Sequence, residues 1–378
     1  MQLDLTDDQY AFRDSLGGLL QARYSWDERR RIVESAAGWS PDVWHDLAEF
    51  GVLALPFRET LGGLGGGGVE HLVVMEAFGE ALVVEPYLST VVVAGGLLDR
   101  AGTPAADALA RAIIAGTARV AWAQGETASR YALNDILTTA RRQGGGYRLD
   151  GAKNVVLDAP VATHLLVTAR TSGERREADG VSLLLVEADR PGIGRHAYRT
   201  IDGRRGAALR FDGVSLGTDA LLFGEGAALP EIERAVDEAA AAAAAEAVGA
   251  MRGLVRGTLS HLTERRQFGR PLAEFQVLQH RMADMFASLE ISHAMALRAA
   301  RAIARPAAER AAAVSAAKAF IGCAARKAGE EAVQLHGGMG MTDELPIGHY
   351  LKRAVAIEAQ FGSTEFHVDR FAGLRRHD

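Results

Sequence analysis

The sequence predicts a mainly α-helical fold with a β domain in the middle of the chain. Three observations carry this prediction. Apolar residues recur at spacings of three and four up to about Gly116, the period changes to two between Arg119 and about Phe223, and the helical spacing returns from Leu229 onward. A chain of 378 residues is long enough for two or three such parts.

The three patterns divide the chain into three predicted domains. These are an N-terminal helical domain over 1–117, a central antiparallel β-sheet or β-barrel domain over 118–225, and a C-terminal four-helix bundle over 226–378.

Two stretches of the first domain, DDQYAFRDSLGGLLQARY and VWHDLAEFGVLAL, have the helical spacing. The glycine-rich stretch LGGLGGGG at 61–68 interrupts the helices. It is read as a turn near a site or, alternatively, as a loop that holds a phosphate. It follows no clear strand and lacks the lysine of a P-loop, which favours the turn.

The middle domain reads as strands, because YRLDGAKNVVL, THLLVTART, GVSLLLVEA and AALRFDGVSL alternate and are separated by turn residues. The last domain opens with an alanine run at 239–245. Alanine is the best helix former and its small side chain lets neighbouring helices approach, so we expect a packed helix here. Three further periodic segments complete about four long helices.

Composition excludes several classes of partner. Charged residues make up 24% of the chain and the formal net charge is −6, which provides no basic field for nucleic acid or an anionic membrane. No apolar run is long enough to span a membrane, and the start, MQLDLTDDQY, lacks the features of a signal peptide. We therefore expect a soluble, cytoplasmic protein. The single cysteine, Cys323, is expected to be a buried packing residue of a helix.

Two motifs carry the sharpest functional information. The first is ERRQFGRPLAEFQVLQHRMADM at 264–285, and the second is QLHGGMGMTDELPIGHYLKR at 334–353. With the order of helices, sheet and helices, they closely resemble the acyl-CoA dehydrogenase family of flavoproteins over essentially the whole chain. The resemblance implies FAD as cofactor, an acyl-CoA substrate, an electron-transfer flavoprotein as acceptor and a tetramer assembled through the helical bundles.

The residue types of these motifs suit the ADP half of FAD. A pyrophosphate needs a fixed guanidinium or oriented backbone amides, and close backbone approach favours glycine. In the resembled family such residues contact the FAD of a neighbouring subunit. The resemblance assigns this role to Arg265, Phe268, Gln276, Gln334, Gly337 and Gly338. The alternative is an exposed cation and a simple helix C-cap.

The family's catalytic base is missing. It is usually a glutamate before a Gly-Thr pair, and the matching stretch here is Gln360, Phe361, Gly362 and Ser363. Phenylalanine cannot accept a proton. The family's second location for the base corresponds to Ala239, which has no carboxylate either. Glu238 and Glu246 lie on the same helix as Ala239 and are expected to face solvent or a helix neighbour rather than to act as base. Glu365, four residues beyond Phe361, is not favoured as the base either, so no catalytic residue is assigned.

The contacts to the flavin ring are altered as well. The family's middle-domain segments correspond to AQGETASRYALND at 123–135 and GAKNVVLDA at 151–159. Val155 stands at the position of a ring-stacking aromatic residue and Leu157 at that of a hydroxyl. The sequence thus retains the ADP half of the site and loses the half that contacts the ring.

With this asymmetry, the chain resembles the small subunits of pimeloyl-CoA-type dehydrogenases and the glutamate-lacking subunits of paired bacterial acyl-CoA dehydrogenases. It implies the non-catalytic half of an α2β2 enzyme whose homologous partner carries the glutamate. Two alternatives stay open. One is a self-sufficient homotetramer with an unrecognised base, and the other is a non-enzymatic CoA-thioester-binding or scaffold protein.

Four other residues have competing interpretations. His336 is read as a residue that caps or packs the glycine turn, and alternatively as a cofactor contact. Met339 and Met341 favour core packing over an acyl tunnel. Ser129 is read as a turn residue, without a histidine pattern for a nucleophile. No spacing of His, Cys and acidic residues predicts a metal site.

Overall fold

The structure is a computed structural model that describes residues 4–375. These residues pack into two compact units. Unit 1 contains the chain through Arg31, Gly67–Val83 and the residues from Ala240 onward, and unit 2 contains Ile32–Gly66 and Val84–Ala239. Each unit draws on more than one predicted domain, so the three-domain division stays a prediction. Its outer ends, 1–3 and 376–378, lie outside the described residues.

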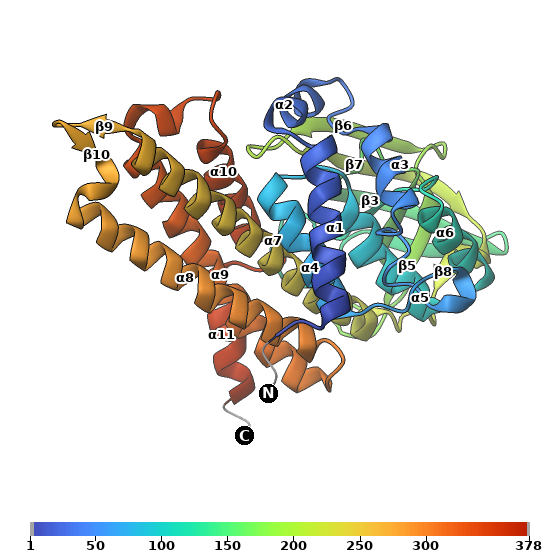
Figure 1. The fold of residues 1–378 in the computed structure, drawn as a ribbon. Helices are drawn as coiled ribbons and strands as arrows, with labels where there is room; N and C mark the ends of the chain where they lie inside the picture. The colour runs from blue at the N-terminus through green and yellow to red at the C-terminus, as the bar shows by residue number, and fades with distance from the viewer. Residues whose placement is uncertain (1–3, 376–378) are drawn as a thin grey trace. The chain divides into compact units, whose positions relative to one another are not determined.

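Unit 1 is helical apart from one short hairpin (Figure 1). The helix α2 crosses from unit 1 into unit 2, and α7 crosses from unit 2 into unit 1. The elements are α1 (Asp7–Arg23), α2 (Trp26–Glu34), α4 (Gly68–Ala81), α7 (Leu229–Glu264), β9 (Arg266–Gln267), β10 (Arg270–Pro271), η4 (Leu272–Glu274), α8 (Gln276–Ala302), α9 (Ala307–His336), η5 (Gly337–Met341), α10 (Pro346–Ala359) and α11 (Thr364–Arg375).

The helix ends follow from local chemistry. Thr6 caps α1 in a capping box, since its hydroxyl accepts from the amide of Gln9 and the Gln9 side chain accepts from the amide of Thr6. Pro346 occupies the first position of α10, where its missing N–H costs nothing.

Glycine lets α4 and α7 approach within unit 1. A Cβ on Gly79 would lie 1.9 Å from the carbonyl oxygen of Glu246, and one on Gly249 would lie 1.9 Å from that of Glu76. Each helix therefore needs glycine where the other backbone passes. The alanine run of α7 is buried, as expected for a packed helix.

Unit 2 is a sheet with short helical segments. Its elements are α3 (Pro41–Glu49), η1 (Glu59–Leu61), the π-helical segment η2 (Leu88–Gly95), α5 (Gly96–Ala101), α6 (Pro104–Ile114), β1 (Val120–Ala123), β2 (Thr139–Gln143), β3 (Gly146–Leu157), β4 (His164–Arg170), β5 (Val181–Glu187), β6 (Ile193–Arg199), β7 (Arg205–Leu216), η3 (Thr218–Ala220) and β8 (Leu221–Leu222). The glycine-rich stretch before α4 forms a tight turn, with Gly62 and Gly65 in left-handed conformations.

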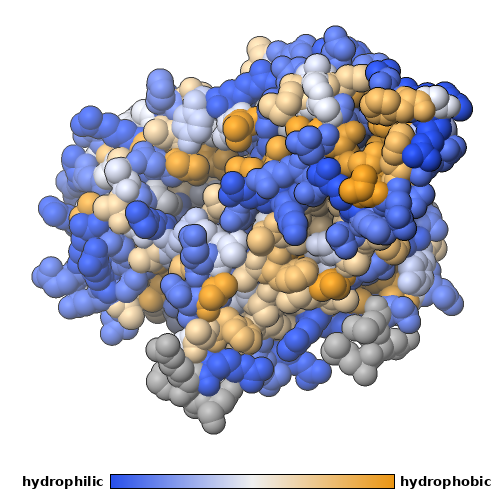
Figure 2. All heavy atoms as spheres, turned by 90° about the vertical axis from the view of Figure 1, so that its left-hand side faces the viewer, coloured by the Kyte–Doolittle hydropathy of each residue, from blue (hydrophilic) through white to orange (hydrophobic). Residues whose placement is uncertain are grey.

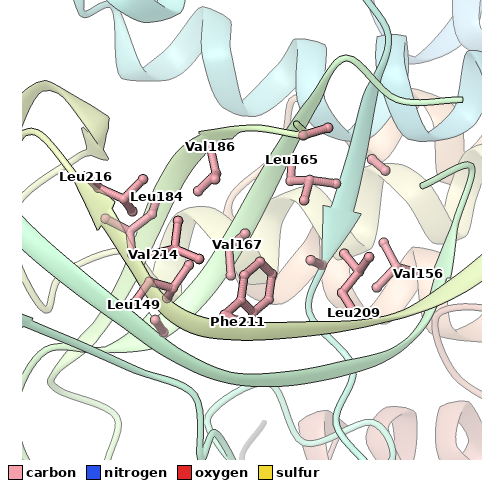
Figure 3. Packing of buried hydrophobic residues seen from close by; sticks show 14 of the residues in the cluster. Leu149, Val156, Leu165, Val167, Leu184, Val186, Leu209, Phe211, Val214 and Leu216 are labelled. Atoms are coloured by element: carbon pink, nitrogen blue, oxygen red, sulfur yellow. The ribbon is translucent and has the colours of Figure 1, made fainter. Parts of the chain in front are cut away.

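The eight strands form one sheet in the order β6-β7-β3-β2-β4-β5-β8, with β1 beside β4. The pairs are antiparallel except that β1 and β2 each pair with β4 in parallel, a difference from the wholly antiparallel expectation. The chain between the paired strands, 124–163 from β1 to β4 and 144–163 from β2 to β4, is long enough for a parallel crossover. Leu149, Leu165, Val167, Leu184 and Phe211 belong to the buried cluster that lies between the strands of the curved sheet (Figure 3).

This architecture confirms the predicted order of helices, sheet and helices. Two expectations about single side chains are wrong. Cys323 lies exposed on α9 rather than buried, on the same stripe as the exposed Arg326 and Lys327. Met339 and Met341 are exposed in η5 and do not pack in the core. Among residues 4–375, no helix has both the length and the apolar character needed to cross a membrane.

Candidate functional site

The two motif segments of unit 1 meet at one end of its helices. His261, near the end of α7, stacks on His336, the last residue of α9, with ring centroids 4.3 Å apart. The chain after α7 carries Arg265, and the chain after α9 carries Gly337. His336 is buried and its Nδ1 lies 2.8 Å from the Ala332 carbonyl, so this ring packs the glycine turn, as the first of its two interpretations expects.

The six residues assigned to the ADP half of FAD are all exposed. Phe268 is 91% exposed at the tip of the β9–β10 hairpin and adopts a left-handed backbone conformation. Its ring makes an edge contact with Phe275, at 6.2 Å between centroids. Gln276 is the first residue of α8. An apolar side chain held so far into solvent is available to a ligand or another chain.

The first two glycines of the second motif border open space. A Cβ built on Gly337 or Gly338 would meet no heavy atom of this chain within 4 Å, and the same holds for Gly269 in the hairpin. Gly337 has a φ of +61°, which favours glycine, whereas Gly338 lies outside the left-handed region. The local backbone therefore does not explain a glycine at position 338, and a ligand that approaches closely would.

The turn that carries Phe361 is fixed through its backbone. Lys318, which is only 1% exposed, donates from Nζ to the carbonyls of Glu358 at 3.0 Å and Gly362 at 2.9 Å. His367 Nε2 lies 3.1 Å from the Phe361 carbonyl. Burial lowers the pKa of Lys318 to about 7, and burial together with Lys318 lowers the pKa of His367 to about 3.

The carboxylates nearest to the family's base positions are engaged or exposed. Glu246 in α7 makes a buried bidentate pair with Arg353 of α10, at 2.7 and 2.6 Å. Glu238 receives hydrogen bonds from Arg100 and Arg234. Ala239 is fully buried and Glu365 is exposed on α11. Each singled-out glutamate thus faces a cationic neighbour or solvent.

In unit 2, the two altered segments lie side by side. The amide of Asn154 donates to the Gly125 carbonyl at 2.8 Å, and its side chain donates to the Thr127 hydroxyl at 2.5 Å. Beside them, Val155 is 69% exposed with a φ of +54°, at an irregularity of the β3–β7 pairing. A β-branched residue in this conformation is strained by roughly 1–3 kcal/mol.

Buried polar groups fix these segments. Glu126 accepts from Lys153 Nζ at 2.8 Å and from the Thr138 hydroxyl at 2.7 Å. Burial opposes the charge of Glu126, but Lys153 and Thr138 outweigh it and lower its pKa. Burial lowers the pKa of Lys153 to about 8, against the opposing effect of Glu126. The Ser129 hydroxyl bonds to the amide and carbonyl of Glu126, in a turn role.

Sequence reasoning missed three features of these sites. Lys318 lies in an otherwise largely apolar stretch, and Lys153 falls on the buried alternation of its strand with Tyr147 and Leu149, and these are the signs that could have indicated a buried ammonium. The left-handed Val155 has no sign in the sequence, because valine disfavours that conformation. Within residues 4–375, no group of three His, Cys, Asp or Glu side chains is placed to hold a metal ion.

Comparisons with known proteins agree with this arrangement. Family models match the chain at 6–112 (acyl-CoA dehydrogenase, N-terminal domain), 121–214 (middle domain) and 229–373 (C-terminal domain). The probable acyl-CoA dehydrogenase YngJ of Bacillus subtilis is 26% identical, with 97% of each chain covered. The caffeyl-CoA reductase-Etf complex subunit CarC of Acetobacterium woodii is 25% identical, covering 83% of this chain and 84% of its own.

A solved structure, the Tcur3481-Tcur3483 steroid ACAD, is 27% identical with a TM-score of 0.88 and 98% of each chain covered. The matches run through the helical ends and the central sheet alike. The chain therefore belongs to the acyl-CoA dehydrogenase family of oxidoreductases.

Proposed function

We propose that this chain is the glutamate-lacking subunit of a hetero-oligomeric, FAD-dependent acyl-CoA dehydrogenase that converts an acyl-CoA to a 2-enoyl-CoA. The observation that carries the proposal is Phe361 at the position of the base, in a turn held by Lys318 through backbone carbonyls. A homologous partner with a glutamate at that position would remove the α-proton. The nearby carboxylate Glu246 is already paired with a buried arginine.

In this proposal the present chain holds the ADP half of the partner's FAD. Arg265 supplies a guanidinium for the pyrophosphate, and the open space at Gly337 and Gly338 lets phosphate oxygens reach backbone amides. Phe268, Gln276 and Gln334 contact the adenosine side. FAD, when bound, accepts the hydride that leaves the β-carbon. These residues bind and orient FAD and take no part in proton transfer.

Assembly with another subunit is supported by the surface of unit 1. Exposed apolar side chains lie on its helices and hairpin, among them Phe268, Val277, Phe286 and Ile291. Figure 2 shows apolar patches within a largely hydrophilic face. Exposed apolar patches mark interaction surfaces. The name Tcur3481-Tcur3483 joins two designations, which favours a two-chain relative, and the Etf complex in the name of CarC favours an electron-transfer flavoprotein as acceptor.

A self-sufficient homotetramer is the second candidate, and one observation favours it. The backbone at Val155 keeps a strained, outward-facing conformation beside the 124–127 segment. Strain of this kind persists where a site requires it. On this view the chain still holds a flavin ring and uses a different base.

The visible absorption spectrum separates the two candidates. The chain is purified alone and also after co-expression with a glutamate-bearing homologue, and FAD is quantified after denaturation. The proposal expects a colourless lone chain and a yellow complex whose flavin falls when Arg265 is replaced by Gln in this chain. About one FAD per lone chain, with turnover of an acyl-CoA, would refute it.

A further inference from the structure

A cavity of about 620 Å³ is lined only by residues of unit 2, whereas the six residues assigned to FAD all belong to unit 1. Three arginines line it, Arg119, Arg199 and Arg205, together with the aromatic side chains of Trp39 and Tyr198. The other described lining residues are alanine, proline and valine, and none of the lining residues is acidic.

Two of these arginines are held by neutral groups. Arg119 Nε donates to the Val161 carbonyl at 2.8 Å, and its guanidinium lies over the Trp39 ring, 4.5 Å from the centroid. Arg205 Nη2 donates to the carbonyls of Val33 at 3.1 Å and Ser35 at 3.0 Å. These contacts orient the two guanidinium groups without neutralising them.

The third arginine adds like charge. Arg199 of β6 stands directly opposite Arg205 of β7 in the sheet register. Like charges in directly opposed positions destabilise a strand pair. Burial and Arg199 together lower the pKa of Arg205, and burial lowers that of Arg119. An anion bound between the arginines would attract each guanidinium group and so offset the repulsion among them.

Gly38 shows that this arrangement is built into the packing. A Cβ at position 38 would lie 2.6 to 2.8 Å from the Arg205 side chain, and φ there is +70°. The loop between α2 and α3 thus closes on the Arg205 stem. On the other side, the Tyr198 ring packs against Gly206, where a Cβ would lie 3.0 Å from it. Both contacts restrict how the cavity wall can move.

We propose that this cavity binds a small organic phosphate with an aromatic body, of the size of a nucleoside monophosphate. Its volume falls within the range of about 300–1,000 Å³ typical of small-molecule sites. The arginine forks suit phosphate oxygens, and the Tyr198 ring with Pro160 and Val161 forms an apolar surface for a planar group. The site is independent of the proposed FAD role.

Calorimetric titration of the full chain with AMP, inorganic phosphate and adenosine tests this. We expect AMP to bind more tightly than either fragment. Arg199 is exposed, so it can be replaced without disturbing the core. Arg199→Gln should weaken the binding of AMP at least about tenfold, and Arg199→Lys should weaken it less. The matched control is Arg210→Gln, an exposed arginine of β7 outside the cavity, which should bind AMP as the wild type does.

Several results would overturn the proposal. One is the absence of AMP binding at millimolar concentration, and another is equal affinity in Arg199→Gln and the wild type. Binding that Arg265→Gln abolishes and Arg199→Gln leaves intact would place the nucleotide on unit 1 instead. If adenosine or inorganic phosphate binds as tightly as AMP, the cavity does not recognise the phosphate and the aromatic body of one ligand together, and the proposal is wrong. Thermal unfolding of each variant establishes that it is folded.

Discussion

The alanine substitution of Gly338 tests the assigned FAD role with little disturbance to the chain. No heavy atom lies within 4 Å of the added methyl group, and the backbone there is outside the left-handed region. The free energy of unfolding should therefore change by no more than about 0.5 kcal/mol. Gly337 is less suitable, because its φ of +61° would strain an alanine.

The effect on FAD should be much larger. If a phosphate packs against the Gly338 backbone, an extra methyl group overpacks the site and costs about 1–3 kcal/mol. This corresponds to FAD binding that is about 5- to 150-fold weaker. The assay is the FAD content and FAD affinity of the complex with the glutamate-bearing homologue, beside thermal unfolding of the lone chain.

The matched control is Gly17→Ala in α1. Gly17 is exposed and also has no atom within 4 Å of its Cβ position, so alanine there should stabilise the helix by up to about 1 kcal/mol without touching FAD. If the Gly338→Ala complex holds FAD as tightly as the Gly17→Ala complex, the assignment of the glycine turn to FAD is wrong.

Three further predictions concern single residues. Phe361→Glu should not produce acyl-CoA dehydrogenase turnover in the lone chain, because the ring contacts are altered as well; robust turnover would show that the flavin pocket is intact. Glu246→Ala should lower the free energy of unfolding by about 3–5 kcal/mol, since it removes the carboxylate that faces the buried Arg353, whereas the exposed control Glu330→Ala should cost under about 1 kcal/mol in denaturant titration. Burial lowers the pKa of Lys318 to about 7, so above that pH the unfolded chain binds more protons than the folded one. The free energy of unfolding should therefore rise between about pH 7 and 10, by up to about 1.4 kcal/mol per pH unit. Lys318→Met should reduce this slope, and an unchanged slope would contradict the burial of the Lys318 amine.

The sequence was sufficient for the order of the elements and for part of the site. Hydrophobic period separates helices from strands, so the sheet between two helical regions could be predicted. The sequence did not predict that the two motif segments meet. They meet where His261 stacks on His336, and hydrophobic periodicity cannot reveal a contact between residues 75 positions apart. The glycine motif nevertheless indicated where backbone is open to a ligand.

Single side chains were harder to predict because their environment is tertiary. Cys323 and Met341 are apolar residues that lie exposed, since α8, α10 and α11 leave one stripe of α9 uncovered and η5 turns outward. Lys318 is a charged residue that is buried, because carbonyls of a distant turn accept its hydrogen bonds. The parallel pairing of β1 with β4 likewise depends on a path of the chain that the strand pattern leaves open.

The contact between α4 and α7 has a consequence for the order of synthesis. The glycines that permit it, Gly79 and Gly249, are separated by most of unit 2 in the sequence, and Gly249 leaves the ribosome long after Gly79. Domains generally fold as units while the chain emerges. Unit 2 is complete once Ala239 has emerged, so throughout that interval α4 lacks the contacts that α7 and α8 later provide. A ribosome-bound chain stalled before α7 would therefore leave the surface of α4 that α7 and α8 cover open to chaperones and proteases, and release from both would require the emergence of α8 as well as α7.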